Sequence, residues 1–480
     1  MDELRKTRLN VQNLEEYISS IQCIRGQSIF INPDELPERI VAIGDIHGDL
    51  EALFSILLKS GIIDINGKWI AVNTFLVQTG DIFDKGRLKP PLQSVGEPQS
   101  IIQQSGPRFI PYSVIDKHGN AQTISSMGVK NNFEFGEVGD ELIILKFLTD
   151  LHQQATTKFG NSRVLLCSGN HEFMNTSVYE YFSDTPSEEV ERIVQEGTNP
   201  EIQAEINKRR VRNFVLSADV VQNRASLSKY TGISHNIDHQ YPHPMDAVLF
   251  GGPEFPLRRE IFRHGSGYLA RKLACILNVI VVVGDFIFSH GGISPVNLRS
   301  INDISELQTI NDIFRDYLLG NPTNPDDIER YFTSDSSILW NRNLGKESAP
   351  DRWVCQNILE FMKNKLHRPN LNIVVGHDIQ GTCIDPIADA DRSLPRVRIA
   401  WNRTNPDGSV SKCITLPTVW CNNQIYRIDT GISRMNNSPD YRTPNEGNLN
   451  SLIIDLNPDG SKKNVSAMNG ILGLHAPIRR

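Results

Sequence analysis

The sequence predicts an α/β fold, a sandwich of two mixed β-sheets with helices on the outside and with insertions. Short β-branched runs alternate with helical patterns in the first half of the chain, as at 39–43, 50–58 and 74–79. Later runs pair like hairpins, as at 279–289. Short islands rich in Gly, Asp, His and Asn follow several of these runs. We therefore expect the islands to gather along one edge of the sheets.

The expected elements follow one another along the chain. Residues 39–43 form a strand, 50–58 form a helix that ends before Gly61, and 74–79 form a second strand. Gly284 and Asp285 separate two apolar runs and predict a tight hairpin. The other expected elements are a helix at 140–159 and strands at 163–168, 279–283, 286–289, 372–375, 424–429 and 449–456.

One large domain accounts for most of the 480 residues. Residues 1–35 are polar with a weak helical pattern, and we interpret them as an N-terminal extension. The domain is expected at 36–470, followed by a tail at 471–480. Within it, about 89–134 and 174–262 interrupt the regular alternation and are interpreted as insertions.

The composition is typical of an ordinary soluble protein rather than of a nucleic-acid-binding or membrane protein. Hydrophobic residues make up 39% and charged residues 22%, and the formal net charge is −7. Phosphate backbones attract basic surfaces, so no nucleic-acid partner is expected. The longest apolar run, 274–283, is interrupted by Asn278 and is too short to cross a bilayer. The N-terminus leads into no segment of signal-peptide type, so we predict a cytoplasmic location.

The cysteines predict neither a disulfide framework nor a thiolate zinc site. They are scattered, odd in number and form no C-x-x-C pair. Cys167 and Cys275 lie in apolar runs and are expected as buried packing residues. The seven are Cys23, Cys167, Cys275, Cys355, Cys383, Cys413 and Cys421.

The first two islands offer carboxylate and imidazole ligands. Asp45 and His47 stand two residues apart after a strand and can aim at one ion, and this donor pair suits Mn, Fe or Zn. Asp81 follows the next strand, and a carboxylate can bridge two cations about 3.5–4 Å apart. Taken alone, Asp45 is equally well a helix N-cap and Asp81 a turn residue. The five islands are 44–49, 80–86, 169–172, 289–292 and 376–378.

The other islands complete a two-metal site. Asn170 and His171 are adjacent, so their side chains diverge; we assign Asn170 as a ligand and leave His171 as a general acid that Asp84 holds protonated. His290 and His377 each close a strand. A lone histidine of this kind is usually structural, but beside three other ligand-rich islands both are interpreted as metal ligands. This ligand set predicts metal-assisted cleavage of a phosphate ester.

The five islands, in this order, resemble the signature of the calcineurin-like metallophosphoesterases, in particular the serine/threonine phosphoprotein phosphatase superfamily. That signature is GDxHG, GDxxDRG, GNHE, HGG and a late GH, and here it spans 44–378. GNHEFMN at 169–175, LWNR at 339–342 and IDTG at 428–431 are similar to the Shewanella-like phosphatase branch. Diadenosine tetraphosphatases share much of the pattern.

The resemblance implies two divalent or trivalent ions, with Mn, Fe or Zn all acceptable. It implies that His171 is the proton donor, paired with Asp84, and that Glu172 orients the site. Arg342 matches a phosphate-contacting arginine of the family. The implied ligands are Asp45, His47 and Asp81 for the first ion, and Asp81, Asn170, His290 and His377 for the second.

One residue departs from the family signature. The arginine of GDxxDRG is replaced by Lys85, a point charge that cannot clamp a phosphate with two parallel hydrogen bonds. Arg87, two residues later, is a candidate to replace it. The two long insertions also mean that the substrate groove of compact phosphatases cannot be transferred to this chain.

These observations predict a dinuclear metal-dependent phosphoesterase. A metal-bound hydroxide would attack phosphorus, His171 would protonate the leaving oxygen, and Lys85 and Arg342 would hold the phosphate. The expected partner is a phosphorylated substrate, foremost a phosphomonoester on a protein side chain. Alternatives are a dinucleoside polyphosphate hydrolase, a catalytically silent binding module that only Lys85 supports, and a phosphodiesterase, which the acidic charge disfavours. The sequence leaves the metals, the substrate, any regulatory subunit and the oligomeric state open.

Overall fold

The structure is a computed structural model of the whole chain, and all structural statements concern the residues it describes. Asp84, Lys85 and Arg87 lie outside the described residues, as do most of the two predicted insertions. The described ranges are 18–24, 26–83, 113–115, 121–123, 141–181, 262–345, 351–384, 401–404, 410–432, 449–468 and 473–474.

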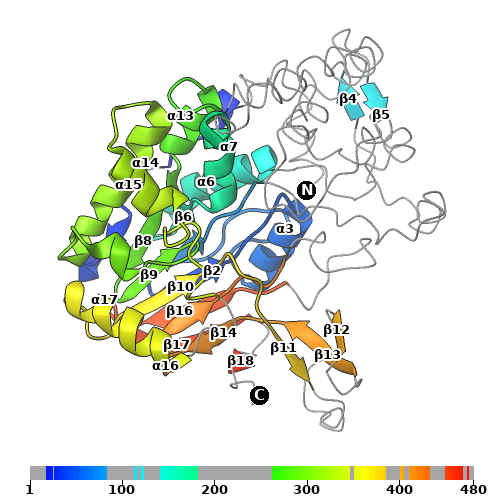
Figure 1. The fold of residues 1–480 in the computed structure, drawn as a ribbon. Coiled ribbons are helices and arrows are strands. Elements are labelled where there is room, and N and C mark those ends of the chain that lie inside the picture. The colour runs from blue at the N-terminus through cyan, green and yellow to red at the C-terminus, as the bar shows by residue number, and fades with distance from the viewer. Residues whose placement is uncertain are drawn as a thin grey trace, which may run out of the picture.

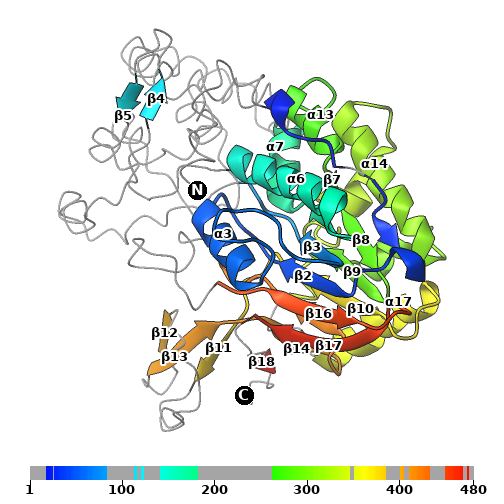
Figure 2. The ribbon, with the colours of Figure 1, turned by 180° about the vertical axis from the view of Figure 1, so that it is seen from behind.

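Two mixed β-sheets pack face to face, and helices cover their outer faces (Figures 1 and 2). The side chains of strand β2 (Arg39–Ile43) alternate between the two faces of its sheet and so identify the layers on either side. Ile40 and Ala42 belong to the apolar cluster between the sheets, whereas Val41 and Ile43 belong to the cluster shared with the helices. Because both faces are buried, the strands are continuous apolar runs. The predicted α/β sandwich is therefore confirmed.

The first sheet has six strands in the order β17-β16-β2-β3-β6-β7. Its centre is parallel, because β2 pairs in parallel with β3 and β3 with β6, while β16 runs antiparallel to β2. The strands are β2 (Arg39–Ile43), β3 (Thr74–Gln78), β6 (Arg163–Cys167), β7 (Leu277–Asn278), β16 (Leu452–Leu456) and β17 (Lys462–Ala467).

The second sheet has seven strands in the order β1-β8-β9-β10-β15-β14-β18. The strands β9, β10 and β15 are mutually parallel. The predicted hairpin is confirmed: β8 and β9 are antiparallel around Gly284, whose φ of 59° suits a residue without a Cβ. The strands are β1 (Ile29–Phe30), β8 (Ile280–Val283), β9 (Phe286–Ser289), β10 (Asn372–Val375), β14 (Thr418–Trp420), β15 (Ile425–Arg427) and β18 (Gly473–Leu474).

Two small sheets accompany the sandwich. One is the three-stranded sheet β11-β13-β12, which projects to one side in both views (Figures 1 and 2). The other is a two-stranded hairpin. Their strands are β11 (Gly381–Ile384), β12 (Trp401–Thr404), β13 (Val410–Thr415), β4 (Ser113–Ile115) and β5 (Ala121–Thr123).

The helices follow the apolar periodicity of the sequence. Those predicted at 50–58 and 140–159 are α3 (Leu50–Lys59) and α6 (Glu141–Lys158), and α6 packs on β6. Figure 2 shows α3 and α6 over β2 and β3. Among the described helices, none has the length and apolarity needed to cross a membrane. The other α-helices are α7 (Asn170–Tyr181), α13 (Tyr268–Ala274), α14 (Gln308–Leu319), α15 (Pro325–Ile328), α16 (Asp351–Val354) and α17 (Glu360–Lys365). The 3₁₀-helices are η1 (Pro33–Glu35), η4 (Pro295–Leu298) and η5 (Ile304–Leu307), and the π-helices are η6 (Glu329–Thr333) and η7 (Cys355–Leu359).

The predicted domain boundaries stay a prediction. Within the segment expected as an N-terminal extension, Ile29 and Phe30 form β1 and pair in parallel with Val282 and Val283 of β8. Phe30 is fully buried in the cluster between the sheets. Part of the polar N-terminal segment therefore contributes to the core.

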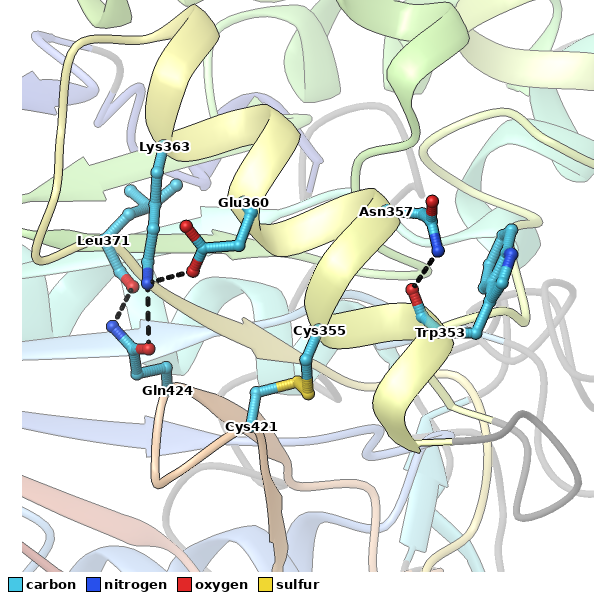
Figure 3. The surroundings of a disulfide bond; sticks show 8 residues. All are labelled: Trp353, Cys355, Asn357, Glu360, Lys363, Leu371, Cys421 and Gln424. Carbon is cyan, nitrogen blue, oxygen red and sulfur yellow. Dashed lines mark hydrogen bonds and ion pairs between the residues drawn. A yellow bond between two sulfur atoms is a disulfide. The ribbon is translucent and has the colours of Figure 1, made fainter.

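The expectation that no cysteines pair is wrong. Cys23 bonds to Cys275, which is consequently not a simple packing residue, and Cys355 bonds to Cys421 (Figure 3). The partners lie 252 and 66 residues apart, so no local spacing pattern could reveal them. Cys167 is buried and unpaired, as expected.

The second disulfide joins a helix to a strand hairpin. Cys355 begins the turn η7 between α16 and α17, and Cys421 directly follows β14. Nearby, Lys363 of α17 donates hydrogen bonds to Glu360 and to Gln424, which precedes β15 (Figure 3). The helical segment 351–365 is thus fixed to the hairpin β14–β15 covalently and by side-chain contacts.

Candidate metal centre

The predicted ligands lie at the carboxyl ends of two sets of parallel strands. Asp45, Asp81 and Asn170 follow β2, β3 and β6 of the first sheet. His290 and His377 follow β9 and β10 of the second. Parallel strands present their carboxyl ends at one edge, and the two sheets place these edges together. The structure thus brings all five islands to one place.

Asp81 lies at the centre of the site. Its Oδ2 atom is 3.3 Å from Nε2 of His290 and 3.8 Å from Nε2 of both His47 and His171. The ligand atoms of His47, Asp81 and His171 lie within 4.8 Å of one another, as do those of Asp81, His290 and His377. Both groups contain Asp81, so this carboxylate is placed to bridge two cations.

Asn170 and Asp45 border the second group. The Asn170 Oδ1 atom is 2.8 Å from Nε2 of His290, and Asp45 Oδ1 is 3.8 Å from its Nδ1. Asp45 is not needed as a helix cap, because Asp49 caps α3 and accepts from Ala52 at 3.0 Å. Asn170 and Asp45 therefore face the same imidazole, and their assignment as ligands stays a prediction.

His171 belongs to the first group, although the sequence predicted that it stays free of the metal. Its Nε2 atom is 3.8 Å from Asp81, and its ring meets the ring of His47 edge-on at a centroid distance of 5.0 Å. The backbone N–H of His171 donates to Asp81 Oδ1 at 3.0 Å. The position suits a proton donor and also a metal ligand. Its predicted partner Asp84 lies outside the described residues.

His377 shows that the donors fit a cation. Its Nε2 atom is buried and has no hydrogen-bond partner among the described residues. Burial, and then the neighbouring His290 and Arg342, lower the pKa of His377 well below its ordinary value. The imidazole is therefore neutral, and its buried Nε2 atom leaves a polar group unpaired among the described residues, which is costly. In the tautomer that has its lone pair on Nε2, a cation would satisfy this atom.

The two carboxylates of the site differ in acidity. Burial raises the pKa of Asp81, but His290, His171 and His47 together outweigh it and hold this pKa well below its ordinary value. Burial, Asp429 and Asp81 raise the pKa of Asp45. A bound cation would favour the ionised form of both carboxylates.

Three predicted ligands have a left-handed backbone. The φ angles are 46° at His47, 55° at Asp81 and 69° at His377. Each such residue costs about 1–3 kcal/mol and persists only where the surroundings fix it. Five other described residues that are not glycine also have a positive φ, so this conformation does not mark the site by itself; it shows that the surroundings fix these three ligands.

Two glycines allow the carboxylates to approach the backbone. A Cβ on Gly169 would collide with the Asp81 side chain, with Cγ at 2.8 Å. A Cβ on Gly376 would collide with Asp45 Oδ1 and would lie 2.8 Å from Thr79 Oγ1. The islands at 169–172 and 376–378 therefore require these glycines in order to hold ligands of other islands.

Glu172 fixes the loop that carries Asp81. Its buried carboxylate accepts from the backbone N–H groups of Asp81 (2.9 Å), Ile82 (2.7 Å), Phe83 (2.9 Å) and Gly169 (2.6 Å). Burial and the nearby Asp81 raise its pKa to about 7, against these hydrogen bonds. The expected role of Glu172 in orienting the site agrees with this geometry.

The rim of the site contains an ion pair. Arg342 donates through Nη1 to Oδ1 of Asp378, the residue that follows His377. The ring of Trp340 meets His377 edge-on at 6.2 Å. Arg342 therefore lies beside a predicted ligand, where a phosphate-binding group is expected.

The sequence reasoning assigned no role to Asp378 or Asp429. Asp429 is buried two residues after the end of β15, which pairs in parallel with β10, and its Oδ1 accepts from Gly431 at 2.8 Å. Burial raises its pKa to about 7. The pattern of a strand followed by Asp and Gly was visible there and resembles the first two islands.

Comparisons with known proteins find relatives that are named as phosphatases. The chain is 25% identical to Shewanella-like protein phosphatase 2 of Arabidopsis thaliana over 418 residues, which cover 85% of this chain and 80% of that protein. It is 22% identical to Shewanella-like protein phosphatase 1 of Plasmodium berghei over 83% of this chain and 68% of that protein. The predicted resemblance to the Shewanella-like phosphatases is confirmed, and the names of both relatives agree with the predicted enzyme class.

A solved structure was also found. It is a cold-active protein-tyrosine phosphatase of a psychrophilic Shewanella species, with a TM-score of 0.41, 16% identity, and coverage of 93% of this chain and 83% of that one. No protein-family model matches the chain.

Proposed function

We propose that this protein is a phosphatase that uses two metal ions to hydrolyse phosphomonoesters on protein side chains. The observation that carries the proposal is the position of Asp81, whose carboxylate belongs to two groups of imidazole ligands. The names of the relatives support the same reaction class.

The donor set determines which ions the site accepts. Carboxylate, imidazole and amide donors suit Mn, Fe and Zn. Asp45, His47 and Asp81 would hold one ion, and Asp81, Asn170, His290 and His377 the other. When bound, these ions would polarise the phosphate, neutralise developing charge and make water more acidic.

The protein side chains would do the remaining work. Arg342 would bind phosphate oxygens by charge-assisted hydrogen bonds, and Lys85 would add a second positive charge. The imidazole of His171, partly exposed beside Asp81, would donate a proton to the leaving oxygen. Glu172 would keep Asp81 in position through the backbone of its loop.

The proposal is tested by removing all metal from the protein, reloading it with manganese and assaying three substrates. These are p-nitrophenyl phosphate, a set of phosphopeptides and diadenosine tetraphosphate. We expect manganese-dependent turnover that is faster on phosphopeptides than on the dinucleotide. Faster turnover of the dinucleotide would make the protein a dinucleoside polyphosphate hydrolase. Manganese binding without turnover of any substrate would identify a silent binding module.

The cytoplasmic location stays a proposal, and the disulfides provide its test. Cytosolic thiols are kept reduced, so Cys23–Cys275 and Cys355–Cys421 would be open in that compartment. Trapping the thiols with an alkylating reagent directly on cell lysis measures their state. Alkylation of all four cysteines would support a cytoplasmic location. Resistance of the four cysteines to alkylation would indicate intact disulfides and an oxidising compartment.

A further inference from the structure

The side chain of Asp378 packs closely against the backbone of Gly345, where a larger residue would not fit. A Cβ on Gly345 would lie 2.8 Å from both Cβ and Cγ of Asp378 and would collide with its Oδ2. The Asp378 side chain is only 14% exposed, although aspartate is usually a surface residue. One edge of the carboxylate thus packs against Gly345, and Oδ1 faces Arg342.

The loop that carries Arg342 is held on both sides. Asn341 is buried and accepts from the backbone N–H of Asn343 at 2.9 Å. On the other side, the carbonyl of Gly345 accepts from Gln380 Nε2 at 3.0 Å, and the same amide donates to the carbonyl of Asp378 at 2.6 Å. Gln380 therefore couples the backbone of the arginine loop to the backbone of Asp378.

The Arg342 side chain, in contrast to the loop that carries it, is held by one contact within the described part of the chain. Among the described residues, its hydrogen bond to Asp378 is the one that the guanidinium makes. The side chain is 29% exposed, so its remaining N–H groups can reach a ligand. A free arginine would lose rotamer entropy on binding a phosphate, and a fixed one has already lost it.

We propose that Asp378 is a positioning residue that holds the guanidinium of Arg342 beside His377 in the orientation that binds a phosphate dianion. The inference rests on the proposed function, because it concerns the phosphate-binding part of the same site. Asp378 acts through Arg342 and does not touch the substrate. Its negative charge balances the positive charge of Arg342 when no ligand is bound. The ion pair also fixes the guanidinium, so a phosphate binds an arginine that is already oriented.

The test is a double-mutant cycle on the manganese-loaded protein. The four proteins are the unsubstituted chain, Asp378→Ala, Arg342→Ala and the double variant. The first readout is the Kd of inorganic phosphate, measured by calorimetry. The second is the split between KM and kcat for p-nitrophenyl phosphate.

We expect Asp378→Ala to raise the Kd of phosphate by about 3- to 30-fold, the upper value being what the whole rotamer entropy of arginine would give. KM should rise in parallel while kcat changes less. In the Arg342→Ala background, the same substitution should change Kd by less than about twofold. Asp378→Asn keeps an oxygen acceptor and should recover part of the affinity.

Three controls separate this role from a merely structural one. Manganese content and melting temperature should not change in Asp378→Asn. Asp455→Ala, which breaks the exposed ion pair with Arg39 on the first sheet, should leave both readouts unchanged. Equal effects of Asp378→Ala with and without Arg342 would overturn the inference. If the unsubstituted protein turns over no phosphoester, the proposed function fails, and the phosphate Kd still decides the inference.

Discussion

The two halves of the metal centre are fixed in different ways. The first half comprises Asp45, His47, Asp81, Asn170 and His171 after β2, β3 and β6. Here the backbone forms most of the supporting contacts: Glu172 accepts from four backbone N–H groups, and the N–H groups of Ile46 and His47 donate to the carbonyl of Asp81.

The second half comprises His290, His377, Arg342 and Asp378. It is positioned by contacts with the first half and with outer elements. The N–H of His377 donates to Asp45, His290 contacts the carbonyl of Thr79 at 3.1 Å, and Arg342 depends on a side-chain ion pair. From this difference we expect the first half to be the more rigid of the two, with Asp81 common to both.

The largest effect should come from the shared carboxylate. Asp81→Asn leaves the backbone nearly unchanged but removes the anion common to both ligand groups. We expect the manganese content of both metal sites to fall and phosphatase turnover to drop by more than about 10⁴-fold. This decrease is larger than the one expected from removing a single proton donor. Metal analysis by mass spectrometry and p-nitrophenyl phosphate assays measure the two effects.

Asp150→Asn is the matched control for this substitution, because it removes a carboxylate of a surface pair with Lys146. It should change neither metal content nor turnover. Retention of full manganese content by Asp81→Asn would contradict the idea that both ions share this ligand. The two halves would then bind metal independently of Asp81.

His171 provides the next largest effect and decides between its two possible roles. If it is the proton donor, His171→Ala should lower turnover by about 10²- to 10⁴-fold and leave manganese content intact. The loss should be smaller for p-nitrophenyl phosphate than for an alkyl phosphate, whose leaving oxygen needs the proton more. His377→Ala, by comparison, should lose manganese. Loss of metal in His171→Ala would instead make His171 a ligand of the first half.

Glu172 tests how rigid the first half is. Glu172→Ala leaves four buried N–H groups without their acceptor, and each such group costs about 1–3 kcal/mol. Allowing for rescue by water, we expect the free energy of unfolding to fall by about 3–5 kcal/mol in total and metal affinity to fall about 10- to 100-fold. Urea unfolding and metal titration check both.

The comparison for Glu172 is Asp378→Asn in the second half, which keeps an oxygen acceptor at that position. It should leave unfolding by urea almost unchanged. Equal destabilisation by the two substitutions would show that both halves are preformed alike.

The disulfide Cys355–Cys421, which lies towards the amino end of β15 and away from the carboxyl end of β10 that precedes His377, should have the smallest effect on catalysis. Cys355→Ser opens a link that spans 66 residues, and the chain-entropy model then predicts a loss of up to about 4 kcal/mol of stability. The metal ligands do not depend on this link, so manganese content and turnover below the melting temperature should persist. Thermal unfolding with and without dithiothreitol measures the effect, and Cys23→Ser, in the other disulfide, is the control. Loss of turnover before unfolding would show that the second half depends on its outer elements.

The sequence by itself determined the units of the fold and the residue types available to the candidate site. Each strand followed by an island is local, because β-branched runs favour strands and glycine next to Asp or His allows a sharp turn. Strands at 39–43, 286–289 and 372–375 were therefore predicted with the bounds that the structure shows. The six candidate ligands were also chosen from the sequence, since ligand chemistry belongs to the residue type, and their assignment stays a prediction.

Only the tertiary structure decided which of these units meet. Two disulfides, the pairing of Arg342 with Asp378, and the sharing of Asp81 by two ligand groups each join residues that are far apart in the chain. The same holds for Ile29 and Phe30, which look like part of a polar extension and lie in a sheet. Strand order and the packing of one sheet on the other determine such contacts. Both depend on the summed burial of the whole core, which no local pattern in the sequence encodes.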